Sequence, residues 1–154
     1  MIDKKNPDNK LEEKVLQIKR VSKKTTGGNN ISFTALVGVG DRNGNVGIAL
    51  GRGLEVPQAI KKAMHYAKKH MIAVPIKNET IPHEVKIKYK GAYLILKPAP
   101  QGAGLKVGSV VRAILSLAGV INASGKILRS RNHSTNTYAV IKALKSFKSK
   151  NNHV

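Results

Sequence analysis

The side chains that could do chemistry are few, and they are not grouped for catalysis. No two histidines have the i, i+4 spacing that places both rings on one helix face, since His65 and His70 lie five residues apart. The chain has no cysteine, which excludes a thiolate zinc site and a cysteine nucleophile. All eight acidic residues lie at or before Glu84, so the second half offers no carboxylate as acid, base or metal ligand. We predict no catalytic residue, no metal, no cofactor and no enzymatic activity.

Two glycine-rich runs suggest nucleotide binding, but neither has the required spacing. Residues 119–126 have one residue too many for a P-loop, and Ile127 stands where a hydroxyl would bind Mg²⁺. Residues 102–108 read GxGxxxG and not the GxGxxG of dinucleotide-binding proteins. We therefore predict no nucleotide site, although these loops could offer backbone N–H groups to an RNA phosphate.

The clearest candidate binding segment runs from Arg20 to Gly28, where Lys23 and Lys24 precede a Thr-Thr-Gly-Gly tip. Cations on a flexible tip can follow a phosphate groove. The six aromatic residues are scattered and match no RNA-recognition-motif signature. We therefore expect contacts with phosphates, shape and 2′-hydroxyls of folded RNA, not base stacking.

The charge of the whole chain supports a polyanionic partner. Among 154 residues, 28 Lys and Arg oppose 8 Asp and Glu, which gives a net charge of +20. The 13 basic residues after Glu84 face no acid at all. Nucleic acid is favoured over a membrane, because Arg112 interrupts the longest apolar stretch, Val107 to Ala123, which falls short of about 18 uninterrupted apolar residues. The start of the chain has no apolar signal segment.

Hydrophobic periodicity predicts two units. After a flexible N-terminus (1–13), the first unit (14–74) alternates as strands over 14–24, 31–40 and 46–50, with loops at 25–30 and 41–45. A helix follows from Pro57, with Lys61, Lys62, Lys68 and Lys69 on its solvated face. A linker (75–83) leads to a second unit (84–150) with strands at 85–90 and 92–97, a helix over 107–118, a short strand within 126–131, and a last helix capped by Ser134 or Thr135.

Two local features have open interpretations. Five glycines lie inside predicted strands and mark a backbone that something approaches closely, either a helix or an RNA or protein partner: Gly38, Gly40, Gly47, Gly51 and Gly53. Arg112 is the one charge on an apolar helix, in a unit without acids. Its partner would then come from outside the chain, unless the side chain reaches water at the helix edge.

Ordered motifs resemble one known family. Those of the first unit are Arg20-Val-Ser-Lys, Gly27-Gly28, Val39-Gly-Asp, Asn43-Gly-x-Val-Gly47 and Glu55-Val-Pro. Those of the second are Pro98-Ala, Gly102-x-Gly104, Val111-Arg-Ala113, Leu117-Ala-Gly119 and Ser130-x-Asn132. Over residues 11–148 the chain resembles the small-subunit ribosomal protein five family. Departures from the family pattern are Asn29, Arg129, His133 and Thr135.

The resemblance implies an α+β fold of two small domains. The first would be a double-stranded-RNA-binding-like three-stranded sheet with a helix, and the second a β-α-β-α domain with a left-handed crossover. It also implies a structural constituent of the small ribosomal subunit at the body/head junction, in the cytoplasm or in a plastid or mitochondrial matrix. The partners would be small-subunit rRNA, ribosomal proteins four and eight, and nearby mRNA, with a contribution to the region where mRNA enters and to translational accuracy.

With this resemblance, we predict rRNA contacts at Arg20, Lys23, Lys24, Gly27, Gly28, Arg42, Arg52, Arg129 and Arg131. The protein-partner interface would include Gly104 and Arg112. The alternative is a basic RNA-processing accessory protein that resembles the ribonuclease P protein subunit, which shares the second-domain fold. That function would require metal-placing residues, and the second unit has no carboxylate for the purpose.

Overall fold

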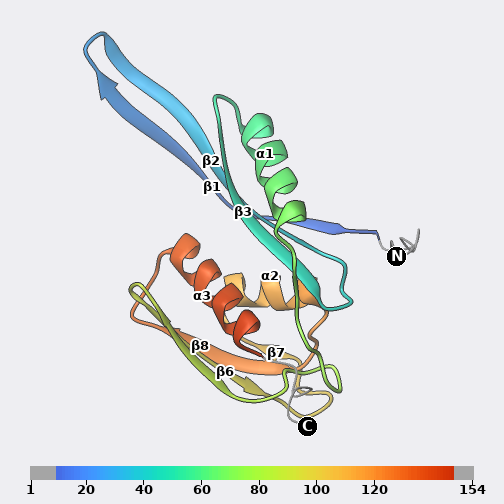
Figure 1. The fold of residues 1–154 in the computed structure, drawn as a ribbon. Coiled ribbons are helices and arrows are strands. Elements are labelled where there is room, and N and C mark those ends of the chain that lie inside the picture. The colour runs from blue at the N-terminus through green and yellow to red at the C-terminus, as the bar shows by residue number, and fades with distance from the viewer. Residues whose placement is uncertain (1–9, 148–154) are drawn as a thin grey trace.

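The computed structural model describes residues 10–147, and its first unit is a sheet covered by one helix (Figure 1). The strands β1 (Glu12–Thr25), β2 (Gly28–Gly40), β3 (Asn45–Gly53) and β4 (Ile72–Ala73) are antiparallel neighbours in that order, and α1 spans Val56–Lys69. The prediction of three strands was therefore wrong by one. Strand β4 pairs only two residues with β3, which is too short for an alternating pattern to appear in the sequence.

Helix α1 packs so closely on the first sheet that glycines are required beneath it. Buried Ala59, Ala63 and Ala67 form its inner face. A Cβ added at Gly47 or Gly51 would overlap the carbonyl oxygens of Ala67 or Ala59, respectively. On this face of the sheet, the close neighbour of the strand glycines is therefore a helix.

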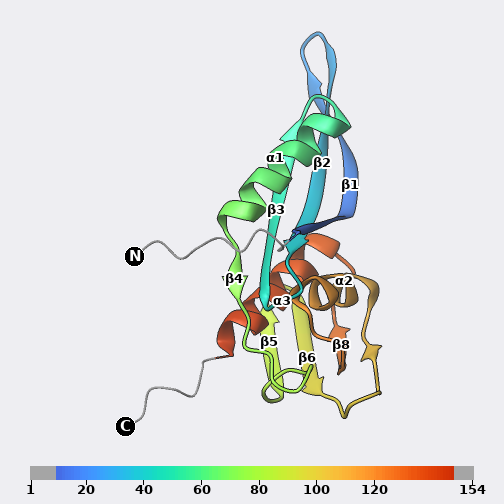
Figure 2. The ribbon, with the colours of Figure 1, turned by 90° about the vertical axis from the view of Figure 1, so that its right-hand side faces the viewer.

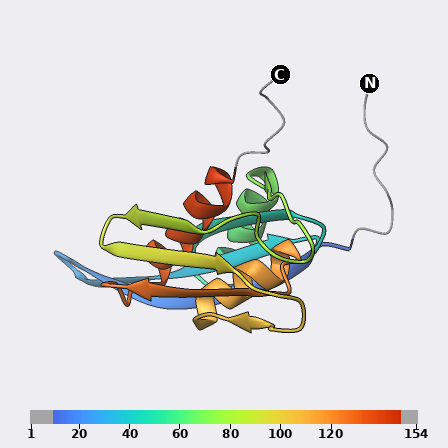
Figure 3. The same cartoon turned by 90° about the horizontal axis from the view of Figure 1, so that it is seen from below.

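The second unit is a mixed sheet with both of its helices on one face (Figure 3). Its elements are β5 (Val85–Tyr89), β6 (Ala92–Pro98), β7 (Leu105–Lys106), α2 (Ser109–Ala118), β8 (Ala123–Leu128) and α3 (His133–Ser146). The strand order is β5-β6-β8-β7, with β7 and β8 parallel and joined through α2. The predicted α+β class is confirmed, and the handedness of the β7–α2–β8 crossover stays a prediction.

The two sheets are joined through α2, which packs against the face of the first sheet that α1 leaves free (Figure 2). A Cβ at Gly40 would overlap the Leu117 carbonyl, so here too the close neighbour is a helix. The backbone N–H of Arg42 donates to the Leu117 carbonyl at 3.0 Å. One apolar cluster includes residues of both units, among them Ile48 and Leu117.

The segment predicted as a linker is folded into this core. Ile81 is 1% exposed, and the Glu79 carbonyl accepts hydrogen bonds from the backbone N–H groups of Ile121 and Asn122, both at 3.0 Å. The boundaries of the two domains themselves stay a prediction.

Three local predictions were wrong. Residues 25–30 are not a loop, because β1 and β2 stay paired up to Thr25 and Gly28. The last helix is capped by Asn132, whose side chain accepts from the Ser134 N–H at 3.1 Å. Strand β8 begins at Ala123, before the predicted range. None of the helices described here is long and apolar enough to cross a membrane.

Candidate nucleic-acid interface

The most prominent feature is a two-stranded arm at one end of the first sheet (Figure 1). Strand β3 last pairs with β2 where Gly53 meets Phe33. Beyond that point, from the Val21–Ser32 pair to the Thr25–Gly28 pair, β1 and β2 bond only to each other. We call residues 21–32 the arm. Since no third strand or helix covers it, nearly all of its side chains are exposed.

The arm closes in a two-residue turn over Thr26 and Gly27. The Thr25 hydroxyl donates to the Gly28 carbonyl at 3.0 Å, and Gly28 has a φ of +138°. No atom lies within 4 Å of a Cβ built at either glycine. The backbone conformation, not a lack of space, therefore requires glycine at Gly28.

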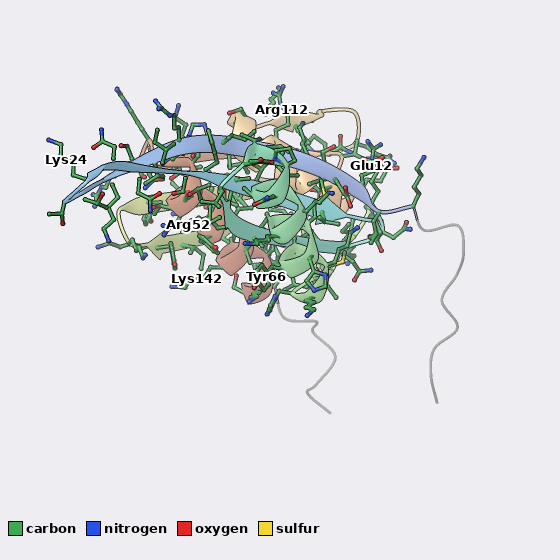
Figure 4. The ribbon with its side chains drawn as sticks, turned by 90° about the horizontal axis from the view of Figure 1, so that it is seen from above. Glu12, Lys24, Arg52, Tyr66, Arg112 and Lys142 are labelled. Atoms are coloured by element: carbon green, nitrogen blue, oxygen red, sulfur yellow. The ribbon has the colours of Figure 1, made fainter. Side chains whose placement is uncertain are left out.

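Cations lie on both faces of the arm and its base. Because side chains alternate along a strand, Lys23 shares a face with Lys19, while Arg20 and Lys24 lie on the α1 side. All four are exposed, and the ion pairs within residues 10–147 involve none of them. Figure 4 shows Lys24 at the far end of the arm. An arm with unpaired cations on two faces can contact phosphates on either side.

Arg52 adjoins the base of this arm. It lies opposite Thr34, which in turn lies opposite Lys19, so the three residues form one row across β3, β2 and β1. Sequence reasoning missed Lys19, although its place in the alternating pattern could have indicated it. Of the predicted rRNA-binding residues, the structure therefore brings Arg20, Lys23, Lys24, Gly27, Gly28 and Arg52 together.

Arg42 lies elsewhere, in the β2–β3 hairpin at the opposite end of the sheet. Its Nε is 2.9 Å from a carboxylate oxygen of Glu12, and its φ is +58°. The backbone of this hairpin is docked on the end of α2, where Gly44 N–H donates to the Ala118 carbonyl at 2.8 Å. Arg42 is thus separated from the arm cations with which it was predicted.

Asp41 organises the same hairpin. Its carboxylate accepts from the backbone N–H of Asn43 at 2.8 Å, from that of Asn45 at 3.1 Å, and from the Asn45 side-chain amide at 2.7 Å. Partial burial on its own raises the pKa of the Asp41 carboxyl, but these hydrogen bonds to the charged form outweigh it and leave the pKa lowered. The carboxylate therefore stabilises the turn, which is a common role of Asp in a hairpin loop.

A cleft of about 460 Å³ brings Arg42 and Arg112 together at the junction of the two units. Ile121, which is 53% exposed, also lines it. The Arg112 guanidinium is exposed and donates to the Leu105 carbonyl at 3.1 Å. Of the two interpretations left open for Arg112, the structure therefore shows the side chain at the exposed helix edge with a backbone carbonyl as its partner, and a contact outside the chain stays a prediction.

Gly104 lies just before Leu105, close to this cleft. It has a φ of +72°, its N–H donates to the side-chain oxygen of buried Asn122 at 3.0 Å, and its carbonyl accepts from Ala123 N–H at 3.2 Å. Gly104 thus holds the start of β7 beside β8. Gly104 and Arg112, which were predicted as one protein-partner interface, therefore lie beside this cleft and in its lining, respectively, and Arg42 lines the same cleft.

Arg129 and Arg131 form a third group in the loop between β8 and α3. Both are exposed, and Arg129 has a φ of +69°. The loop is held by Ser130, whose carbonyl accepts from the Asn136 side-chain amide at 3.3 Å. In Figures 1 and 3 this loop and the arm lie towards the same side of the molecule, the arm in the first unit and the loop in the second. Within residues 10–147, no three His, Cys, Asp or Glu residues are grouped to hold a metal ion.

Comparison with known proteins gives two family matches in order along the chain. The family described as "Ribosomal protein S5, N-terminal domain" matches residues 11–75, and "Ribosomal protein S5, C-terminal domain" matches residues 87–153. A protein named "Small ribosomal subunit protein uS5" from Thermus thermophilus is 44% identical over 144 residues, which cover 94% of this chain and 89% of the relative. The proteins of the same name from two individual strains of that organism give the same values.

Proposed function

The chain belongs to the ribosomal protein S5 family, and from this premise we propose that its arm binds small-subunit rRNA at the junction of body and head. Membership in the family confirms four predictions: a protein of the small ribosomal subunit, located with the ribosome in the cytoplasm, built as α+β, and not an enzyme. The specific contacts are our proposal.

The arm, with its exposed cations that form no ion pair within residues 10–147, gives this proposal its main support. It extends cations on both faces beyond the packed part of the sheet, without an acidic residue from Val21 to Ser32. A feature with no core of its own does not stabilise the fold, and unpaired like charges on it repel each other. A polyanion removes that cost, since each phosphate contact releases condensed counterions. Arg20 and Arg52 extend this contact to the base of the arm, and Arg129 and Arg131 add a further contact on the same side of the molecule, from the second unit.

The cleft with Arg42, Gly104 and Arg112 is the proposed interface with ribosomal protein four. Two guanidinium groups and exposed Ile121 suit a partner surface that has a carboxylate beside apolar side chains. We propose ribosomal protein eight as a further partner. We further propose that the protein lies beside incoming mRNA and influences translational accuracy.

The alternative of an RNA-processing accessory protein is less well supported. A resemblance to the second-domain fold alone would leave the first unit and its arm unexplained, whereas both S5 family matches together span most of the chain.

The experiment is a charge reversal on the arm. Full-length protein with Lys23→Glu and Lys24→Glu is added to small subunits assembled without this protein, and its incorporation is compared with that of wild type. We expect the variant to fold, because both side chains are exposed, and to incorporate poorly. The matched control reverses two exposed lysines on α1, Lys61→Glu and Lys62→Glu. Equal incorporation of the arm variant and wild type would contradict the proposal.

A further inference from the structure

The second sheet has a bare face covered with lysines. Helices α2 and α3 lie on the opposite face, and in Figure 3 no described helix covers the side nearest the viewer. Side-chain alternation assigns inward positions to buried residues such as Leu94 and Leu96. The outward positions include five exposed lysines from all four strands, which we call the lysine face: Lys86, Lys88, Lys97, Lys106 and Lys126.

The strand register arranges this face in rows. Lys88 lies opposite Tyr93, which lies opposite Leu128, and Leu128 is 39% exposed. In the next row Lys86 and Lys126 lie on either side of Ile95. In the last row Lys97 and Lys106 lie on either side of Ser124. The centre of the face is therefore partly apolar, and lysines surround it.

Ordinary explanations for surface lysines do not account for the pattern. Lysines on an edge strand prevent edge-to-edge aggregation, but Lys97 and Lys126 lie on the central strands β6 and β8. A solvated sheet surface usually mixes both signs of charge. Within residues 10–147, the one ion pair to a lysine of this face comes from Glu84, whose carboxylate is 3.8 Å from Lys86 Nζ, and the chain has no acid after Glu84.

We infer that the lysine face is a second rRNA contact, separate from the arm, on which an RNA segment lies with phosphates against the lysines and sugar or base faces over the apolar centre. This inference rests on the proposed function. Charge decides the class of partner: the face carries five lysines, and the unit to which it belongs, residues 85–147, contains 11 Lys and Arg and no acid, which favours a polyanion over a protein of mixed charge. Tyr93 at the centre offers an aromatic ring to an unpaired base.

The first test measures salt dependence. Lys88→Gln, Lys97→Gln and Lys126→Gln are combined, which leaves out the ion-paired Lys86 and removes three charges from surface positions. The variant is incorporated into small subunits that contain no wild-type copy of this protein. Its affinity for these subunits is then measured as a function of KCl concentration. Each lost phosphate contact lowers the slope of log affinity against log salt by roughly 0.7–0.9, so we expect a slope about 2 units shallower than that of wild type.

The matched control removes three exposed lysines from α1, as Lys61→Gln, Lys62→Gln and Lys69→Gln, and should keep the wild-type slope. A wild-type slope for the lysine-face variant, while Lys23→Glu with Lys24→Glu still impairs incorporation, would overturn this inference alone. Failure of wild type itself to join the subunit would overturn the proposed function as well.

The second test identifies the occupant. The chain has no cysteine, so Lys88→Cys introduces a single thiol that can carry a photoactivated aryl azide. After assembly and irradiation we expect the label to crosslink to small-subunit rRNA. A crosslink to a ribosomal protein alone, or no crosslink in assembled subunits, would overturn the assignment of RNA to this face.

Discussion

Asp41 is a single residue whose ionisation should be measurable in the stability of the whole chain. Its pKa is lowered in the folded state, so its contribution is present above the ordinary value of 3.8 and is lost as pH falls through the lower folded value. Asp41→Asn should therefore reduce the free energy of unfolding by about 1.5–3 kcal/mol at pH 7, the scale of hydrogen bonds to a charged group. Urea unfolding at pH 7 and at pH 2 measures the difference.

The control is Glu55→Gln, which makes the same chemical change at an exposed helix cap whose side chain makes no capping hydrogen bond. It should leave stability nearly unchanged at both pH values. A loss in Asp41→Asn that is as large at pH 2 as at pH 7 would show that the turn depends on shape and not on the charge of the carboxylate.

A single substitution at Arg112 tests the proposed protein interface. Because its guanidinium is exposed and bonds one backbone carbonyl, Arg112→Leu should change stability by less than about 1 kcal/mol. It should nevertheless weaken docking of the partner and alter translational accuracy, measured with an error reporter in cells. Unchanged error rates together with unchanged subunit assembly would return Arg112 to a solvated surface residue.

The same residue indicates what sequence can and cannot predict about a site. The residue types at the site could be recognised in the sequence: cations before a Gly-Gly pair, and one arginine on an apolar helix. The hydrogen-bond partners of these residues could not. The Leu105 carbonyl that accepts from Arg112 belongs to a strand of two residues, which is too short to show in the sequence. The place of Arg42 was not predictable either: its rRNA contact stays a prediction, but its position in the cleft follows from the docking of its hairpin on Leu117.

At the scale of elements, the contact of α1 with the first sheet gives a further prediction. A Cβ at Gly51 would overlap the Ala59 carbonyl and lie 2.6 Å from the Ala63 backbone nitrogen, so Gly51→Ala forces the helix away from the sheet. We expect a loss of about 1–3 kcal/mol, as for overpacked cores, measured by thermal or urea unfolding.

Gly91→Ala is the matched control, since no atom lies within 4 Å of its added Cβ. It should be nearly neutral. If Gly51→Ala were equally neutral, α1 would not lie in the close contact described here.

Periodicity predicted most elements because their apolar faces are continuous. It located α1, β5 and β6 well, with buried alanines at helical spacing and lysines alternating along β5. It missed β4 and β7, since two residues carry no period. It also assigned the arm tip to a loop, because Thr-Thr-Gly-Gly has a loop composition while its backbone stays paired to the turn.

At the scale of the whole molecule, the arrangement of the two units could not be predicted from local patterns. Gly38 and Gly40 were recognised as sites of close approach, but only the structure identifies Leu117 of α2 as the neighbour. Pro75 and Pro82 predict a linker over 75–83, yet Ile81 is buried in the shared core. The resulting body keeps the arm and the lysine face free of helices, which leaves two basic surfaces available to RNA.

The central claim is that phosphate contacts hold this protein in the small subunit, and co-sedimentation with small subunits over a series of KCl concentrations tests it most directly. We expect full-length protein to sediment with the subunit at moderate salt. We also expect its release as salt rises, with a slope of log affinity against log salt that sums roughly 0.7–0.9 for every phosphate contact. Binding that stays flat from low to moderate salt, or protein that remains in the supernatant throughout, would contradict it.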